Sequence, residues 1–245
     1  MPEGSQDALR RAIARATEGL PPVSPEMRFE LRRKVLHVVV AVIAVPMLLL
    51  LPLIWNVLIA STGVAVITIT WAVERRRLPE QFKGPLHDEL AGVLVATRRP
   101  HEDFPWSPVL YTASLIILGF AHDLLGLPRS IALAAYAILG LGDATSALVG
   151  VAYGRTKLPW NRRKSWEGTA AGLVAGLMGG VVMGVVPLAF AGQAPTLGFL
   201  GVVVVGAVAG SLAETMPRVE DNFVVPLAAA AAMFGAALLL GVALP

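Results

Sequence analysis

The residues from Gly140 to Gly168 place a carboxylate inside an apolar run and follow it with a dense cationic segment. Asp143 stands among Leu, Ala and Gly residues, and a carboxylate in a membrane-length segment is costly and usually functional. The segment after it carries five cations, namely Arg155, Lys157, Arg162, Arg163 and Lys164. Such charge density favours phosphate as a ligand. The stretch therefore predicts an active site at a membrane surface.

More polar side chains stand at the ends of other apolar runs. They are Arg33, Lys34, His37, Glu214, Asp221 and Asn222. Three carboxylates beside a group of cations fit a metal-bound polyphosphate, because Mg²⁺ prefers a few carboxylates together with phosphate oxygens and water. We therefore expect Asp143, Glu214 and Asp221 to hold Mg²⁺. Three plainer interpretations stay open: a paired Asp143 that joins helices, ordinary helix-end charges at Glu214 and Asp221, and an interfacial His37.

The composition places these residues in a membrane protein. Of 245 residues, 56% are apolar and only 15% are charged, whereas soluble domains carry about 25% charged residues. The apolar residues form blocks near the ~20 residues that cross a bilayer as a helix. The sequence contains no cysteine, which excludes disulfides, zinc–thiolate sites and thiol nucleophiles. We expect an all-α, polytopic integral membrane protein.

Seven apolar spans are predicted. Their ranges are 35–54, 57–73, 108–122, 130–150, 169–189, 197–213 and 223–244. The third is short for a full crossing, and Gly140 and Gly142 suggest that the fourth breaks or opens beside Asp143. Residues 1–30 form a polar amino-terminal segment. Residues 31–245 form a single transmembrane catalytic domain, whose polar loops are 74–107, 152–168 and 214–222.

The positive charges are distributed unequally between the two ends of these spans. Nineteen of the twenty Lys and Arg residues fall on one side, and only Arg129 falls on the other. The positive-inside rule then predicts a cytoplasmic amino terminus, an external carboxyl terminus and an active site on the cytoplasmic side. In a prokaryote the membrane would be the plasma membrane.

The fifth span has a glycine at every fourth position. These are Gly168, Gly172, Gly176, Gly180 and Gly184. A stripe of small residues lets another helix approach closely. Packing within the chain is the favoured interpretation, and a homodimer through the stripe stays open.

Several common nucleotide and metal motifs are absent. The sequence contains no Walker loop, no Rossmann glycine motif and no H-E-x-x-H. A soluble nucleotide-binding fold is therefore not expected, and neither is a nucleic-acid partner.

Three groups of residues within roughly 30–230 together match a known pattern. The groups are Gly142-Asp143, Gly150, Gly154-Arg155, Lys157 and Lys164-Ser165-Trp166-Glu167-Gly168; Arg33-Lys34 with His37; and Glu214, Asp221-Asn222 and Pro226. On these residues the chain resembles the CTP-dependent lipid-alcohol kinases, the family of dolichol kinase, phytol kinase and CTP-dependent diacylglycerol kinase. The resemblance implies transfer of the CTP γ-phosphate to a membrane lipid hydroxyl, with Mg²⁺.

The resemblance also implies roles for individual residues. The loop from Arg155 to Gly168 would bind the nucleotide, with Gly154, Arg155, Lys157, Arg163, Lys164, Ser165, Glu167 and Gly168 as its binding residues. Asp143 would be a metal ligand or the general base, with His37 and Lys164 as further catalytic groups. Glu214 and Asp221 would help to hold the metal. Arg33, Lys34 and Asn222 would position the lipid or a phosphate.

Two other functions compete with this interpretation. Phosphatidate cytidylyltransferases combine a similar G-R-x-x-G-K motif with a K-T-x-E-G-like ending. Here Asn161, Arg162 and Arg163 stand where that family has Ser-Pro, and a second carboxylate beside Asp143 is missing. A non-catalytic transporter or lipid-binding protein is the third candidate, but a transporter should carry polar groups reachable from both sides.

Overall fold

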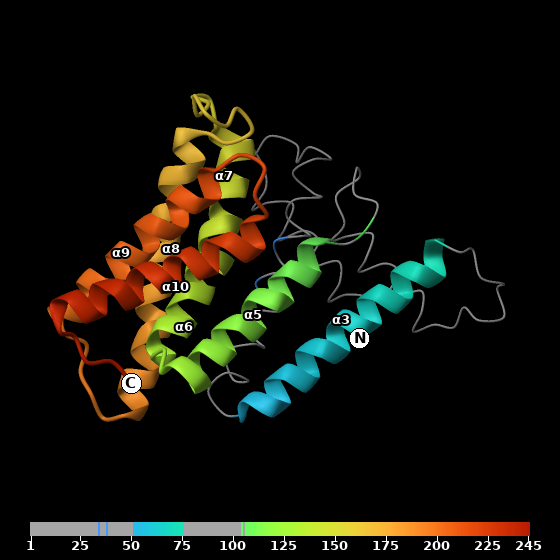
Figure 1. The fold of residues 1–245 in the computed structure, drawn as a ribbon. Helices are drawn as coiled ribbons and strands as arrows, with labels where there is room; N and C mark the ends of the chain where they lie inside the picture. Colours follow the sequence, from blue (N-terminus) through green and yellow to red (C-terminus); the bar gives the residue numbers. More distant parts are fainter. Residues whose placement is uncertain (1–33, 35–37, 39–50, 76–103, 105) are drawn as a thin grey trace, which may run out of the picture.

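The computed structural model describes residues 34, 38, 51–75, 104 and 106–245. Within them the chain is helical, and the only extended pairing is an isolated bridge between Lys157 and Ser165. The helices labelled in Figure 1 are α3 (Leu53–Arg75), α5 (Trp106–Leu125), α6 (Arg129–Ala137), α7 (Ala144–Tyr153), α8 (Trp166–Phe190), α9 (Leu197–Thr215) and α10 (Asp221–Leu240). A π-helical segment, η2 (Ile138–Asp143), connects α6 to α7. The predicted all-α class is confirmed for this part of the chain.

Six helical stretches among the described residues are long and apolar enough to cross a membrane. They are Ile54–Ala72, Trp106–Leu125, Arg129–Tyr153, Trp166–Phe190, Leu197–Thr215 and Asp221–Leu240. The protein is therefore a multi-pass membrane protein. The first predicted span, the segment 1–30 and most of the 74–107 loop lie outside the described residues, so the count of seven spans and the orientation stay predictions.

The third predicted span is longer than the sequence suggested. Helix α5 has 20 residues, which suffices for a crossing, and the expectation of a short span was wrong. It extends beyond the apolar run at both ends, beginning at Trp106 and continuing through His122 and Asp123. Pro108 is compatible with the first turn, because the first N–H groups of a helix have no partner within it.

The fourth predicted span is continuous rather than broken. It runs for 25 residues from Arg129 to Tyr153 through α6, η2 and α7. The predicted opening at Gly140 and Gly142 takes the form of six π-helical residues that end at Asp143. Single π-helical turns within α-helices are frequent at functional sites.

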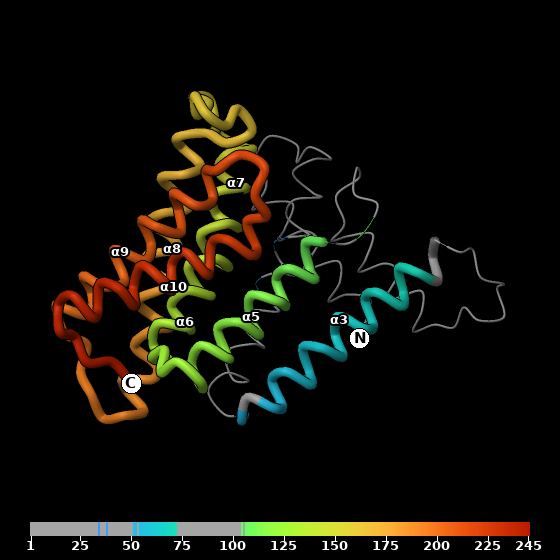
Figure 2. The backbone as a smooth tube through the Cα atoms, viewed as in Figure 1, coloured from blue at the N-terminus to red at the C-terminus, as the bar shows by residue number. Residues whose placement is uncertain are grey.

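This fourth span is the core of the bundle. Residues 130–140 are all buried, and α8, α9 and α10 all pack against the α6–η2 stretch. Helix α5 lies against α10, and α3 lies against α5 at the edge of the molecule, as Figures 1 and 2 show. The outer face of α8 carries exposed Val174, Met178 and Val182, at the spacing of a stripe that faces lipid.

The glycine stripe of α8 is buried inside the chain. A side chain at Gly172 would place its Cβ 2.7 Å from the Cβ of Ser146 and 2.9 Å from the carbonyl oxygen of Gly142. Gly180 and Gly184 are likewise buried, against Ile138 and Phe199. This face of α8 therefore packs within the chain. Its glycines are buried there and are not exposed to a second copy of the protein.

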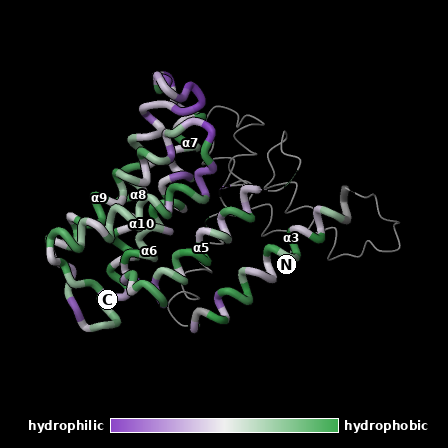
Figure 3. The backbone as a smooth tube through the Cα atoms, in the orientation of Figure 1, coloured by the Kyte–Doolittle hydropathy of each residue, from purple (hydrophilic) through white to green (hydrophobic). Residues whose placement is uncertain are grey.

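Polar residues gather at one end of the bundle. Figure 3 shows hydrophilic residues concentrated in the loop between α7 and α8 and in the nearby loop between α9 and α10, while the helices themselves are mostly apolar. These two loops cover residues 154–165 and 216–220. They bring together parts of the chain that lie about 50 residues apart, as the hydrogen bond from Asn161 to Thr215 shows.

Candidate functional site

Lys164, in the loop between α7 and α8, contacts one carboxylate near the end of α9 and one at the start of α10. Its Nζ donates to Oε1 of Glu214 at 2.7 Å and to Oδ2 of Asp221 at 3.1 Å. Burial would lower the pKa of Lys164, but the nearby carboxylates raise it by more, so its pKa lies above the usual value. The ammonium therefore stays charged. The sequence placed all three residues in one site, and the structure brings them into direct contact.

Asp143 and Lys34 form a second, deeper ion pair. Lys34 Nζ contacts Asp143 Oδ2, and both side chains are almost fully buried. A carboxylate inside a membrane-spanning helix is tolerated when a cation compensates it. Asp143 is thus a paired residue, as the plainer interpretation of the sequence expected. This pairing does not by itself assign a chemical role.

A serine connects the Lys164 ion pair to the membrane span that carries Asp143. Ser146 lies three residues after Asp143 and donates its hydroxyl to Oε1 of Glu214 at 2.5 Å. The same carboxylate oxygen therefore accepts from both Ser146 and Lys164. The ion pairs together contain three carboxylates and two ammonium groups.

The loop motif Lys-Ser-Trp-Glu-Gly has a clear local basis. Ser165 caps the amino terminus of α8, since its Oγ accepts from the backbone N–H of Gly168 at 3.2 Å. Glu167 accepts from the backbone N–H of Thr156 at 3.0 and 3.2 Å, which closes the loop on itself. Leu158 donates its N–H to the carbonyl of Lys164 at 3.1 Å. Ser165 and Glu167, predicted to bind nucleotide, thus hold the loop in shape.

Two predicted nucleotide-binding glycines serve close packing. A Cβ at Gly168 would lie 2.7 Å from the carbonyl oxygen of Ser146. A Cβ at Gly154 would overlap the side chain of Ser165 and the carbonyl oxygen of Gly150. Any larger residue would push the loop away from α7. These glycines therefore fix how close the loop and α8 lie to the carboxylate pairs.

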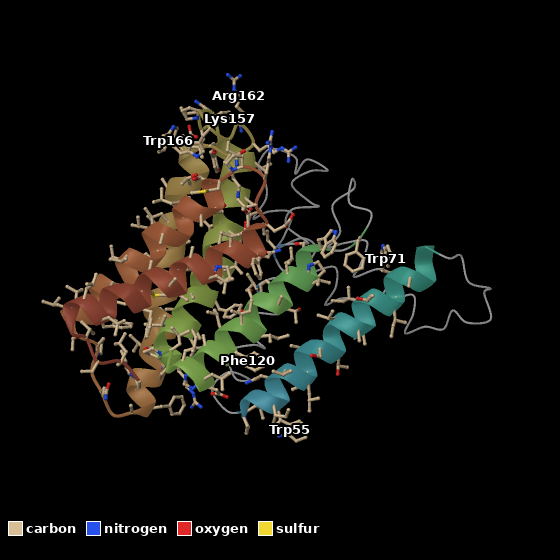
Figure 4. The ribbon with its side chains drawn as sticks, in the orientation of Figure 1. Trp55, Trp71, Phe120, Lys157, Arg162 and Trp166 are labelled. Carbon is tan, nitrogen blue, oxygen red and sulfur yellow. The ribbon has the colours of Figure 1, made fainter. Side chains whose placement is uncertain are left out.

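The remaining cations of the loop face outward. Arg155, Lys157 and Arg163 are exposed, as is Arg162, and no ion pair is found for them among the described residues. Figure 4 shows Lys157 and Arg162 at the outer end of the loop. Only Lys164 turns inward. Contact of Arg155, Lys157 and Arg163 with a nucleotide stays a prediction.

Asn161 is a site residue that sequence reasoning missed. Its Nδ2 donates to the carbonyl oxygen of Thr215 at 3.1 Å, and its Oδ1 accepts from the N–H of Arg163 at 3.2 Å. The loop is thereby fixed to the end of α9, one residue after Glu214. The only signal in the sequence was that Asn161 differs from the competing cytidylyltransferase motif.

Asn222 lies next to Asp221 but connects different helices. Its side-chain Nδ2 donates to Ser107 Oγ at 2.5 Å, and its backbone carbonyl oxygen accepts from Ser114 Oγ at 3.1 Å. These bonds tie the start of α10 to α5. Asn222 thus holds two helices together, and its predicted role in positioning lipid or phosphate stays a prediction. Arg33 and His37, predicted for the same region, lie outside the described residues.

The carboxylates fit a magnesium ion only in part. No group of three His, Asp or Glu side chains is spaced to hold a metal in the described part of the chain. Asp143, the third predicted ligand, contacts Lys34, and its part in a metal site stays a prediction. Glu214 and Asp221 do converge on one point, where the ammonium of Lys164 lies. Two carboxylates suffice for Mg²⁺ when phosphate oxygens and water supply the other ligands.

No protein-family model, curated protein or solved structure matches this chain.

Proposed function

We propose that the protein is a membrane enzyme that transfers the γ-phosphate of CTP to the hydroxyl of a lipid alcohol, giving a lipid monophosphate and CDP. One observation carries the proposal: Lys164 meets Glu214 and Asp221 at one end of an apolar bundle, joined through Ser146 to the helix that bears Asp143. Phosphoryl transfer needs mainly positioning, charge neutralisation and a base. CTP as donor follows from the motif resemblance alone.

Different residues supply the positioning, the charge neutralisation and the base. The lipid hydroxyl oxygen attacks the γ-phosphorus, the bond to the bridging oxygen of CDP breaks, and the hydroxyl proton passes to the carboxylate of Asp143. Lys34 holds that carboxylate in place. Lys164 exchanges its carboxylate partners for phosphate oxygens of the nucleotide. Mg²⁺ would neutralise phosphate charge, and Glu214 and Asp221 would hold it.

The position of the cluster supports a lipid as the acceptor. Asp143 belongs to a membrane-length helix, and the surrounding helices expose apolar residues such as Val174 and Met178. Among the described residues, the paired carboxylates and lysines lie at one end of the bundle. This favours chemistry at a membrane surface over transport, which requires access from both sides. The charge distribution of the loops favours the cytoplasmic surface.

The test uses purified protein, Mg²⁺ and CTP labelled on either the α- or the γ-phosphate. The acceptors are polyprenol, phytol, diacylglycerol and phosphatidate, each in the same detergent micelles. Transfer of γ-label alone to an alcohol is the predicted result. Transfer of α-label to phosphatidate, with release of pyrophosphate, would instead identify a cytidylyltransferase. No transfer to any acceptor would refute the proposed activity toward these lipid classes.

A further inference from the structure

The α7–α8 loop carries an aromatic pair that the phosphate chemistry does not use. The indole rings of Trp160 and Trp166 meet edge to face, with centroids 5.6 Å apart and ring planes at 85°. Each side chain is 49% exposed. A pair that is half exposed offers aromatic surface to a ligand while its two rings support each other.

The pair is held in a rigid frame. Trp166 donates its backbone N–H to the carbonyl of Thr156 at 2.9 Å, and Lys157 and Ser165 form a bridge across the loop. Leu158, which belongs to the same loop, is fully buried. A membrane anchor needs only an amphipathic ring at the interface, whereas a binding face gains affinity when its side chains are held in advance.

The pair is close in sequence to Lys164, the lysine proposed to bind phosphate. Lys164 precedes Trp166 by two residues and turns inward to Glu214 and Asp221. Figure 4 shows Trp166 and Lys157 at the same end of the molecule, far from Trp55. Figure 3 shows that this loop is among the most hydrophilic parts of the described chain. An aromatic surface next to a cation cluster matches the two halves of a nucleotide, its base and its phosphates.

We infer that the base of the nucleotide stacks on the Trp160–Trp166 pair while its phosphates lie toward Lys164. The inference rests on the proposed function and extends it to base recognition. Stacking of a base on an aromatic side chain contributes about 1–3 kcal/mol and tolerates different bases. The pair therefore supplies affinity for nucleotides in general, and selectivity for one base would have to come from hydrogen bonds elsewhere.

The test measures binding rather than turnover. Full-length protein in nanodiscs of zwitterionic phosphatidylcholine is titrated with CTP and with inorganic tripolyphosphate, both with Mg²⁺. The variants are Trp160→Ala, Trp166→Ala and Trp166→Phe, with Trp55→Ala as a matched control at the opposite end of the protein. Trp55 is similarly exposed, at 54%.

We expect each alanine variant to lose about tenfold in CTP affinity, equivalent to ~1.4 kcal/mol, with tripolyphosphate affinity unchanged. Trp166→Phe should keep most of the affinity, and Trp55→Ala all of it. Equal losses for both ligands would show that the indoles only maintain the loop, and no loss would show no contact with the base. Either result overturns the inference.

A second measurement tests the competing interpretation as an interface anchor. Lipids brominated near the headgroup quench indoles that lie among them, and the loss of quenching in the Trp160→Ala and Trp166→Ala variants reports the contribution of this pair. We expect little contribution from the pair, and CTP should change its emission. A dominant contribution that CTP leaves unaltered would overturn the inference in favour of lipid. If wild-type protein binds no CTP while still binding tripolyphosphate, the proposed function fails together with the inference.

Discussion

Ser146 on α7 donates its hydroxyl to Glu214 on α9 at 2.5 Å, so a carboxylate that Lys164 holds is oriented by the helix that also carries Asp143. Ser146 therefore links Glu214 to the membrane span whose π-helical segment η2 ends at Asp143. A change at Ser146 should affect Glu214 without removing any charge. This relationship gives the first prediction.

Ser146→Ala should reduce lipid phosphorylation about tenfold or more, because a hydrogen bond to a charged group contributes about 1.5–3 kcal/mol. The effect should fall on kcat more than on the KM for lipid, since Ser146 lies beside the phosphate end of the site. Steady-state kinetics check this. Thr145→Ala removes a neighbouring hydroxyl of the same helix and should leave both constants near wild type. Equal effects of the two variants would contradict the role of Ser146.

Lys164→Met should abolish transfer and destabilise the protein. It leaves two carboxylates facing each other without their cation, and removing one partner of a buried ion pair costs about 3–5 kcal/mol. Because the side chain of Lys164 is 22% exposed, we expect the lower end of that range. Thermal unfolding in detergent measures it. Arg162→Gln, an exposed cation of the same loop, is the matched control and should unfold like wild type.

Asp143→Asn should eliminate phosphoryl transfer while the protein still folds. Asparagine keeps a hydrogen-bond acceptor for Lys34 but cannot take the hydroxyl proton. A double variant, Lys34→Met with Asp143→Leu, removes both charges of this ion pair. It should remain inactive. Near-normal turnover in either variant would exclude Asp143 as the base.

Gly172→Ala should lower both stability and activity. The added Cβ would overlap Ser146 and the backbone of Gly142, so α8 must move away from the helix that carries Asp143. Overpacking of this kind costs about 1–3 kcal/mol. Gly235→Ala in α10 meets no atom within 4 Å and is the control. Its stability should match or exceed wild type. Comparison of the two melting temperatures decides whether close packing at Gly172 is essential.

The helical bundle was predictable because hydropathy and length largely determine membrane spans. The continuous apolar run around Asp143 became the α6–η2–α7 span, and the run before Glu214 became α9, with small boundary changes. Span ends were less predictable. Helix α5 continues through His122 and Asp123, since a helix can extend into polar residues once its apolar part is packed.

The members of the candidate site could be predicted, but not how they pair. Charge and position grouped Asp143, Lys164, Glu214 and Asp221 at one end. Nothing in the sequence says that Lys164 turns inward while Arg163 next to it faces water, because side-chain direction depends on the loop's hydrogen bonds. The role of Asn161 depends on a carbonyl 54 residues away, and no local pattern encodes that distance.

The proposed reaction is tested most directly by following the γ-phosphate of labelled CTP into a lipid alcohol with purified wild-type protein and with Lys164→Met in parallel. We expect a labelled lipid monophosphate and CDP with wild-type protein, and at least a hundredfold less product with the variant at the same amount of folded protein. Equal product from both proteins would contradict the proposed site. Absence of labelled lipid with the wild-type protein would contradict the proposed reaction.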